Sequence, residues 1–132
     1  MRPIFLDTSA VLPLFIEEPF TPSAQAMLDS ADKIFAWSWM RVEAEAGFSR
    51  RKAGQEIWRE WRKWMQNVYW LHVEAKELDH LCTFNRPLGL RAADAGHLYV
   101  CEKIVRVIPD MLLVTFDHEM KRAARILGLD MW

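Results

Sequence analysis

Apolar and polar positions alternate along the chain in blocks that favour strands followed by helices. Short apolar runs bounded by turn or charged residues predict strands over residues 4–6, 33–38, 69–73 and 111–116, and a further edge strand over 129–132. Between these runs, apolar residues recur three or four positions apart and predict helices over residues 10–16, 21–32, 40–51, 57–68, 74–84, 92–105 and 119–127. Parallel neighbouring strands need crossover connections, which are usually helical. The pattern therefore predicts an α/β fold with a central, mostly parallel, five-stranded sheet flanked by helices.

The composition fits one compact domain that spans residues 1–132. The 132 residues are 52% hydrophobic and include seven tryptophans, so the chain has ample apolar surface to bury. No internal repeat, low-complexity tract or linker interrupts the alternation of strands and helices. A disordered chain is therefore excluded, and a single domain is expected.

The net charge limits how the protein could bind nucleic acid, and the cysteine content indicates its cellular compartment. The 17 basic and 18 acidic residues leave a net charge of -1, so any contact with nucleic acid must come from a local basic patch. Cys82 and Cys101 have neither the spacing of a metal site nor the density of a secreted disulfide scaffold. The N-terminus does not resemble a signal peptide, and no apolar stretch is long enough to span a bilayer. We therefore expect a cytoplasmic protein that does not associate with membranes.

Acidic residues stand where the predicted elements meet one edge of the sheet. Asp7 and Asp117 each directly follow a predicted buried strand. Glu43 lies on the helix after the second strand, and Asp94 lies at the start of a later helix. In parallel α/β sheets, functional groups gather at the carboxyl ends of the strands. A single aspartate at a strand end is more often a helix cap, but four acids in these positions together indicate an active site.

Neighbouring carboxylates repel one another and need positive charge to compensate. A divalent cation is the natural partner, and carboxylate oxygens without thiolates favour Mg²⁺ or Mn²⁺. Such an ion activates water and neutralises the charge of a phosphate group. We therefore expect Asp7, Asp94 and Asp117 to bind the metal and the site to hydrolyse phosphodiester bonds.

Four blocks of the sequence carry a family resemblance. They are "FLDTSAVLPLF", the helix over 38–51 that contains Glu43, "LRAADAGHLYV" and "LLVTFDHEMKRAARILGL". In this order, and over nearly the whole chain, they resemble the signature blocks of the PIN domain, in particular those of the VapC-type toxins of bacterial toxin–antitoxin pairs. The resemblance implies a metal-dependent ribonuclease that acts on RNA and has a cognate antitoxin. It further implies an acidic cluster formed by Asp7, Glu43, Asp94 and Asp117, with Thr115 supporting a metal-bound water.

Three other polar side chains near these blocks have open roles. Glu45 is two residues from Glu43 and points to a different face of the helix, so only one of the two can belong to the acidic cluster. Glu43 fits the family's spacing better. His97 is one turn from Asp94 and could contact substrate, although a buried, hydrogen-bonded histidine is the favoured interpretation. His118 could contact phosphate, although a solvated loop position is favoured.

Basic and aromatic residues suggest where RNA and protein partners would bind. Arg50, Arg51 and Arg91 lie near the acidic blocks and could hold RNA phosphates. Trp58, Trp61 and Trp64 form one apolar helical stripe, which fits either the core or a partner surface. Because VapC-type proteins dimerise through such helices, the resemblance also implies a homodimer.

Two rival functions remain beside the nuclease. A receiver-type signalling domain also gathers acids at the end of a parallel sheet, but it needs an aspartate after the third strand, where this chain has Glu74 and Ala75. A catalytically silent PIN-like module that acts through protein contacts is the alternative that stays open. The intact acidic residues argue against it.

Overall fold

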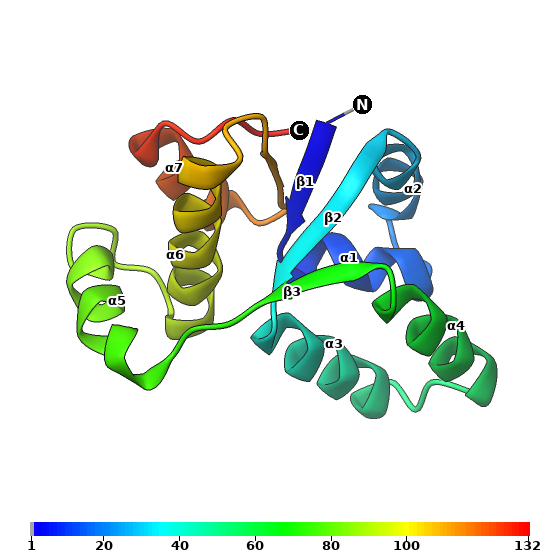
Figure 1. The fold of residues 1–132 in the computed structure, drawn as a ribbon. Helices are drawn as coiled ribbons and strands as arrows, with labels where there is room; N and C mark the ends of the chain where they lie inside the picture. Colours follow the sequence, from blue (N-terminus) through cyan, green and yellow to red (C-terminus); the bar gives the residue numbers. More distant parts are fainter. Residues whose placement is uncertain (1) are drawn as a thin grey trace.

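The computed structural model describes residues 2–132, and its elements alternate between strands and helices (Figure 1). The strands are β1 (Arg2–Leu6), β2 (Ala31–Trp37), β3 (Val68–Leu71) and β4 (Leu112–Val114). The helices are α1 (Thr8–Phe15), α2 (Thr21–Asp29), α3 (Trp39–Arg50), α4 (Gln55–Met65), α5 (Leu78–Asn85), α6 (Ala92–Val107) and α7 (His118–Leu127), and a short 3₁₀ helix, η1 (Ala75–Glu77), precedes α5. This order confirms the predicted α/β fold.

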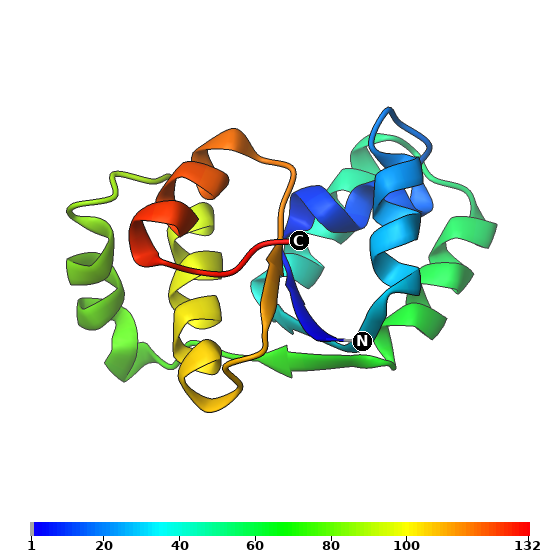
Figure 2. The same cartoon turned by 90° about the horizontal axis from the view of Figure 1, so that it is seen from above.

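The sheet is parallel throughout, with the strand order β3-β2-β1-β4. Helices α1 to α4 lie on one side of it and α5 to α7 on the other (Figures 1 and 2). Side chains of β1 alternate between the two layers, because successive residues of a strand point to opposite faces. Phe5 belongs to the core under α6 and α7, whereas Ile4 and Leu6 belong to the core under α1, α3 and α4.

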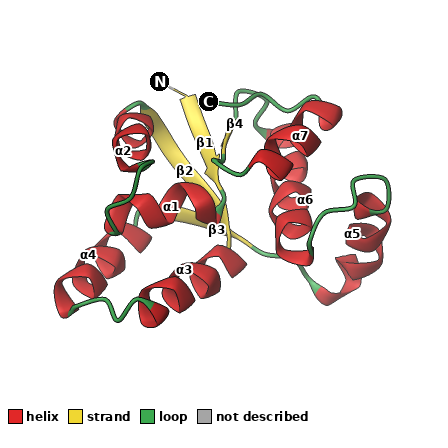
Figure 3. Cartoon of the chain, turned by 180° about the vertical axis from the view of Figure 1, so that it is seen from behind, coloured by secondary structure: helices red, strands yellow, loops and turns green. Residues whose placement is uncertain are grey.

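The prediction of five strands was wrong, because the described residues form a sheet of four. The segment expected as an edge strand, 129–132, makes a single parallel bridge, between Met131 and Leu113. Strand β4 has only three residues and already pairs with β1 on its other side, so it offers a very short edge to a fifth strand. The segment therefore lies beside the sheet without extending it as a strand (Figure 3).

The tryptophan stripe of α4 contributes chiefly to the core. Trp61 is fully buried, and its indole Nε1 donates a hydrogen bond of 2.9 Å to Oε2 of Glu45 on α3. Trp58 and Trp64 are partly buried and pack against the same cluster. Glu45 therefore joins α3 to α4, which leaves Glu43 free for a different role.

Gly96 is a position where α6 packs directly against the side chain of Trp37 on β2. A Cβ atom there would lie 2.3 Å from two carbon atoms of the Trp37 ring, well inside van der Waals contact. Glycine in a helix costs about 1 kcal/mol relative to alanine. The close packing of Trp37 explains why the chain carries this cost.

We expect Gly96→Ala to lower the free energy of unfolding by about 1–2 kcal/mol, because overpacking outweighs the gain in helix propensity. Urea denaturation would measure the change. Gly54→Ala is the control, since a Cβ atom at that position would meet no other atom within 4 Å. The loss should shrink in a Trp37→Ala background, where the obstructing ring is gone. An undiminished loss there would show that the packing against Trp37 is not the cause.

Candidate active site

Three of the four predicted acidic residues lie where a helix begins at the carboxyl edge of the sheet, and the fourth, Glu43, lies one turn into α3. Asp7 follows β1 and precedes α1, and its backbone N–H donates to the carbonyl of Val114 on β4. Asp117 follows β4 and precedes α7. Asp94 lies in the first turn of α6, and Glu43 lies in α3. Four separate elements therefore supply the candidate site.

Asp7 is buried, and hydroxyl groups hold both of its carboxylate oxygens. Ser9 Oγ donates to Oδ1 at 2.7 Å, and Thr115 Oγ1 donates to Oδ2 at 2.7 Å. Its side chain makes no hydrogen bond that caps α1. Burial raises the pKa of Asp7 to about 6, although His97 and the two hydroxyls act to lower it. Asp7 therefore carries an electrostatic cost that a helix cap does not explain.

Ser9 and Thr115 tie together the two loops that carry Asp7 and Asp117. Ser9 Oγ accepts a hydrogen bond of 2.9 Å from the backbone N–H of Phe116, and Thr115 Oγ1 accepts one of 3.1 Å from that of Asp117. Sequence reasoning found Thr115 only through the family resemblance, and it missed Ser9. The signal available for Ser9 was a hydroxyl residue two positions after an aspartate at a strand end.

Asp117 and Asp94 differ in their local roles. Oδ1 of Asp117 accepts a hydrogen bond of 3.0 Å from the backbone N–H of Met120 and so caps α7. The pKa of Asp94 is raised, first by burial and then by the negative charge of Asp117, and the charge of Glu43 adds to the effect. Among residues 2–132, neither aspartate nor Asp7 forms an ion pair. Their mutual repulsion is therefore relieved only by more distant groups, since His97 acts to lower the pKa of both Asp7 and Asp94 and Arg91 acts to lower that of Asp94.

Glu43 is held by two donors that reach it from other elements. Its Oε1 accepts hydrogen bonds from Thr8 Oγ1 at 2.8 Å and from His97 Nε2 at 2.7 Å. Burial acts to raise the pKa of Glu43, but the bond and the charge of His97 outweigh it, and the pKa lies below its usual value. Glu43 is therefore ionised and fixed in orientation.

His97 is 1% exposed and hydrogen-bonded, as the favoured interpretation predicted. Because the carboxylate of Glu43 can only accept, Nε2 carries the proton of this bond, while the buried Nδ1 has no partner among the described residues. The ring also lies edge-to-face with Trp37, with centroids 5.1 Å apart. Sequence reasoning missed the link to Glu43, since 54 residues separate the two positions. His118 is exposed at the start of α7.

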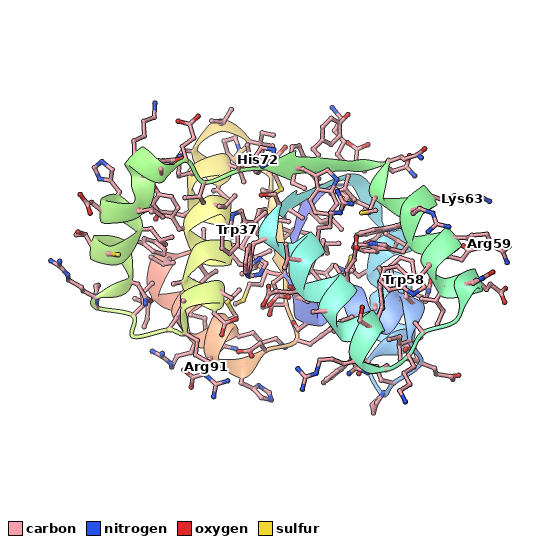
Figure 4. The ribbon with its side chains drawn as sticks, turned by 90° about the horizontal axis from the view of Figure 1, so that it is seen from below. Trp37, Trp58, Arg59, Lys63, His72 and Arg91 are labelled. Carbon is pink, nitrogen blue, oxygen red and sulfur yellow. The ribbon has the colours of Figure 1, made fainter. Side chains whose placement is uncertain are left out.

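The predicted RNA-binding arginines are exposed and form no ion pair within residues 2–132. Arg50 and Arg51 line a groove between α1 and α3 with a volume of about 570 Å³, whose other lining residues are Thr8, Leu12, Glu43, Ala46 and Gly47. The groove therefore leads from Glu43 to two free guanidinium groups. Arg91 directly precedes α6 and lies apart from this groove, at the N-terminal end of the helix (Figure 4).

The carboxylates are oxygen donors that suit a hard divalent ion, and their crowding favours a cation. Within residues 2–132, no group of three or more His, Cys, Asp or Glu side chains already stands close enough to hold a metal ion. The acids therefore match the chemistry of such an ion without forming a closed cage. None of the helices of residues 2–132 has the length and apolar character needed to cross a membrane.

Comparison with known proteins gives consistent matches. The family model described as PIN domain matches residues 4–126. Ribonuclease VapC46 of Mycobacterium tuberculosis is 29% identical over 134 aligned residues, which cover 98% of this chain and 95% of that protein.

Two solved structures share the fold. A toxin-antitoxin complex from Klebsiella pneumoniae matches with a TM-score of 0.66 at 14% identity, over 86% of both chains. The protein PAE2754 from Pyrobaculum aerophilum matches with a TM-score of 0.60 at 20% identity, over 90% of this chain and 82% of that one.

Proposed function

Because this chain belongs to the PIN domain family, we propose that it is a metal-dependent ribonuclease that hydrolyses phosphodiester bonds of RNA. The observation that carries the proposal is Asp7, a buried carboxylate whose two oxygens accept hydrogen bonds from Ser9 and Thr115. Burial raises its pKa to about 6, and the pKa of Asp94 is raised as well. Two neighbouring carboxylates with raised pKa values do not stabilise the fold unless a cation binds beside them. A metal-dependent nuclease needs a cation to bind at this place.

The metal would be Mg²⁺ or Mn²⁺, held by Asp7, Asp94 and Asp117. Carboxylate oxygens are the donors that these ions prefer, and none of the three aspartates forms an ion pair with a basic residue within residues 2–132. When bound, the ion supplies an activated water and charge neutralisation at the phosphate. Ser9 and Thr115 hold both oxygens of Asp7 in place, so this ligand is oriented before any ion arrives.

Glu43 would accept the proton of the attacking water. Its lowered pKa keeps it ionised, and Thr8 and His97 fix its orientation. Arg50, Arg51 and Arg91 would contact RNA phosphates, because their guanidinium groups are exposed and without acidic partners in residues 2–132.

The biological role we propose is that of the toxin in a toxin–antitoxin pair, acting in the cytoplasm as a homodimer with a cognate antitoxin as partner. Two relatives support this role by their names, a VapC ribonuclease and a toxin-antitoxin complex. A catalytically silent PIN-like module is the alternative. The hydrogen-bond network around Asp7 and Glu43 favours the enzyme, since protein contacts at other surfaces would not need it.

The test compares Glu43→Gln with Glu45→Gln in cleavage of structured and unstructured RNAs with Mg²⁺ or Mn²⁺. We expect the wild type to cleave, and Glu43→Gln to lose about a hundredfold in rate, because a general base contributes that much or more. Glu45→Gln is the matched control, since Glu45 bonds Arg41 and Trp61 and should affect stability instead. Absence of cleavage across the panel, or equal rates for both variants, would contradict the proposal.

A further inference from the structure

Trp39 is a large aromatic side chain left exposed at the candidate site. It is the first residue of α3 and is 47% exposed, although most tryptophans of the chain are buried or partly buried. Glu43 follows it by four residues on the same helix, and residues at this spacing lie on the same face one turn apart. We propose that Trp39 is a stacking platform for an unpaired base of the RNA, an inference that rests on the proposed ribonuclease function.

Trp39 is linked to Glu43 through two packed side chains, Trp37 and His97. Its ring lies against that of Trp37, with centroids 6.2 Å apart and an interplanar angle of 33°. Trp37 packs on the backbone of Gly96 and on the ring of His97, whose Nε2 bonds Glu43 at 2.7 Å. Figure 4 shows Trp37 between α3 and α6. The exposed ring is therefore backed by a packed layer that ends at Glu43.

The partly exposed face of α3 that borders the groove carries, in order, the kinds of group that a single RNA strand needs. Trp39, Glu43, Gly47 and Arg50 follow one another at intervals of three or four residues. The groove described above occupies the part of this face from Glu43 to Arg50 and Arg51. A strand along the face would meet guanidinium groups for its phosphates, then Glu43, then an aromatic face for a base.

The charges of this face favour RNA over a protein partner. Arg50 and Arg51 have no ion-pair partner in the described chain, so an anionic ligand would compensate them. Aromatic stacking of a base requires that the base has left its own helix. Stacking on Trp39 would therefore need an unpaired base beside the bond that is cut.

The experiment measures binding of labelled oligouridine, oligoadenosine and an abasic sugar-phosphate strand in EDTA, by fluorescence anisotropy. We expect Trp39→Ala to weaken binding of both base-carrying strands about tenfold and to leave the abasic strand and the salt dependence unchanged. Trp39→Phe should retain most of the affinity. Trp132→Ala is the matched control, because Trp132 is 44% exposed at the chain end, away from α3 (Figure 1).

Equal binding of oligouridine by Trp39→Ala and Trp132→Ala would overturn the inference. A change of oligomeric state in Trp39→Ala, measured by light scattering, together with unchanged RNA affinity, would assign the ring to a protein interface and overturn it too. These results differ from failure of the proposed function, in which the wild type itself neither binds nor cleaves any RNA.

Discussion

The Asp7→Asn variant is expected to be more stable than the wild type in EDTA and to lose RNA cleavage. In the folded chain the pKa of Asp7 is about 6, against an ordinary value of 3.8, because the carboxylate is buried. A pKa raised on folding means that the stability contributed by this group is complete below 3.8 and is lost as the pH rises through about 6. The amide of the variant does not ionise, so the variant does not lose this stability as the pH rises.

The size of the change in stability follows from the difference between the folded and the ordinary pKa of Asp7. It corresponds to at most about 3 kcal/mol at neutral pH. One of the two hydroxyls, Ser9 or Thr115, then faces the amide NH2 and must turn from donor to acceptor, which costs part of this. We therefore expect a net gain of about 1–2 kcal/mol at about pH 8, falling toward zero near pH 4. Urea denaturation in EDTA at several pH values measures it.

Activity should change in the opposite direction, because asparagine offers a neutral and weaker ligand to a hard cation. Asp32→Asn is the matched control, since Asp32 is exposed on β2 and its loss should move stability by less than about 0.5 kcal/mol. A variant of Asp7 that is destabilised at every pH and still cleaves RNA would show that Asp7 serves the fold alone.

Removal of divalent cations is expected to abolish cleavage completely and reversibly. Without a cation, Asp7, Asp94 and Asp117 repel one another, and neither water activation nor charge neutralisation is available. Adding Mg²⁺ or Mn²⁺ should restore cleavage and raise the melting temperature of the wild type, because an ion that binds only the folded state stabilises it. Cleavage and melting are measured on the same samples.

Two controls separate binding of an ion from screening of charges. Potassium chloride at matched ionic strength should change the melting temperature little. Asp7→Asn should show a much smaller rise with Mg²⁺ than Asp32→Asn, because the first removes a proposed ligand and the second does not. Undiminished cleavage in excess EDTA would rule out the metal-dependent mechanism.

The fold class and the position of the acids could be predicted from the sequence. The short continuous apolar run of β1 and the helical spacing of α4 depend on neighbours a few positions away, so the chain itself displays them. Parallel strands end at one edge, which is enough to bring Asp7 and Asp117 together. Glu43 was preferred to Glu45 through the family resemblance, and the side-chain contacts of the two residues are consistent with that preference.

The tertiary structure alone decided how these groups are held. The bond between His97 and Glu43 joins residues 54 positions apart, and that between Thr115 and Asp7 joins residues 108 positions apart. The sheet has four strands because β4 is too short to template a fifth, and only the packed structure shows that Trp37 lies against Gly96 whereas Trp39 is 47% exposed. Local periodicity determines which faces are buried. Which side chains are in contact depends on the relative positions of the packed helices to within about an ångström. No local sequence pattern encodes those positions.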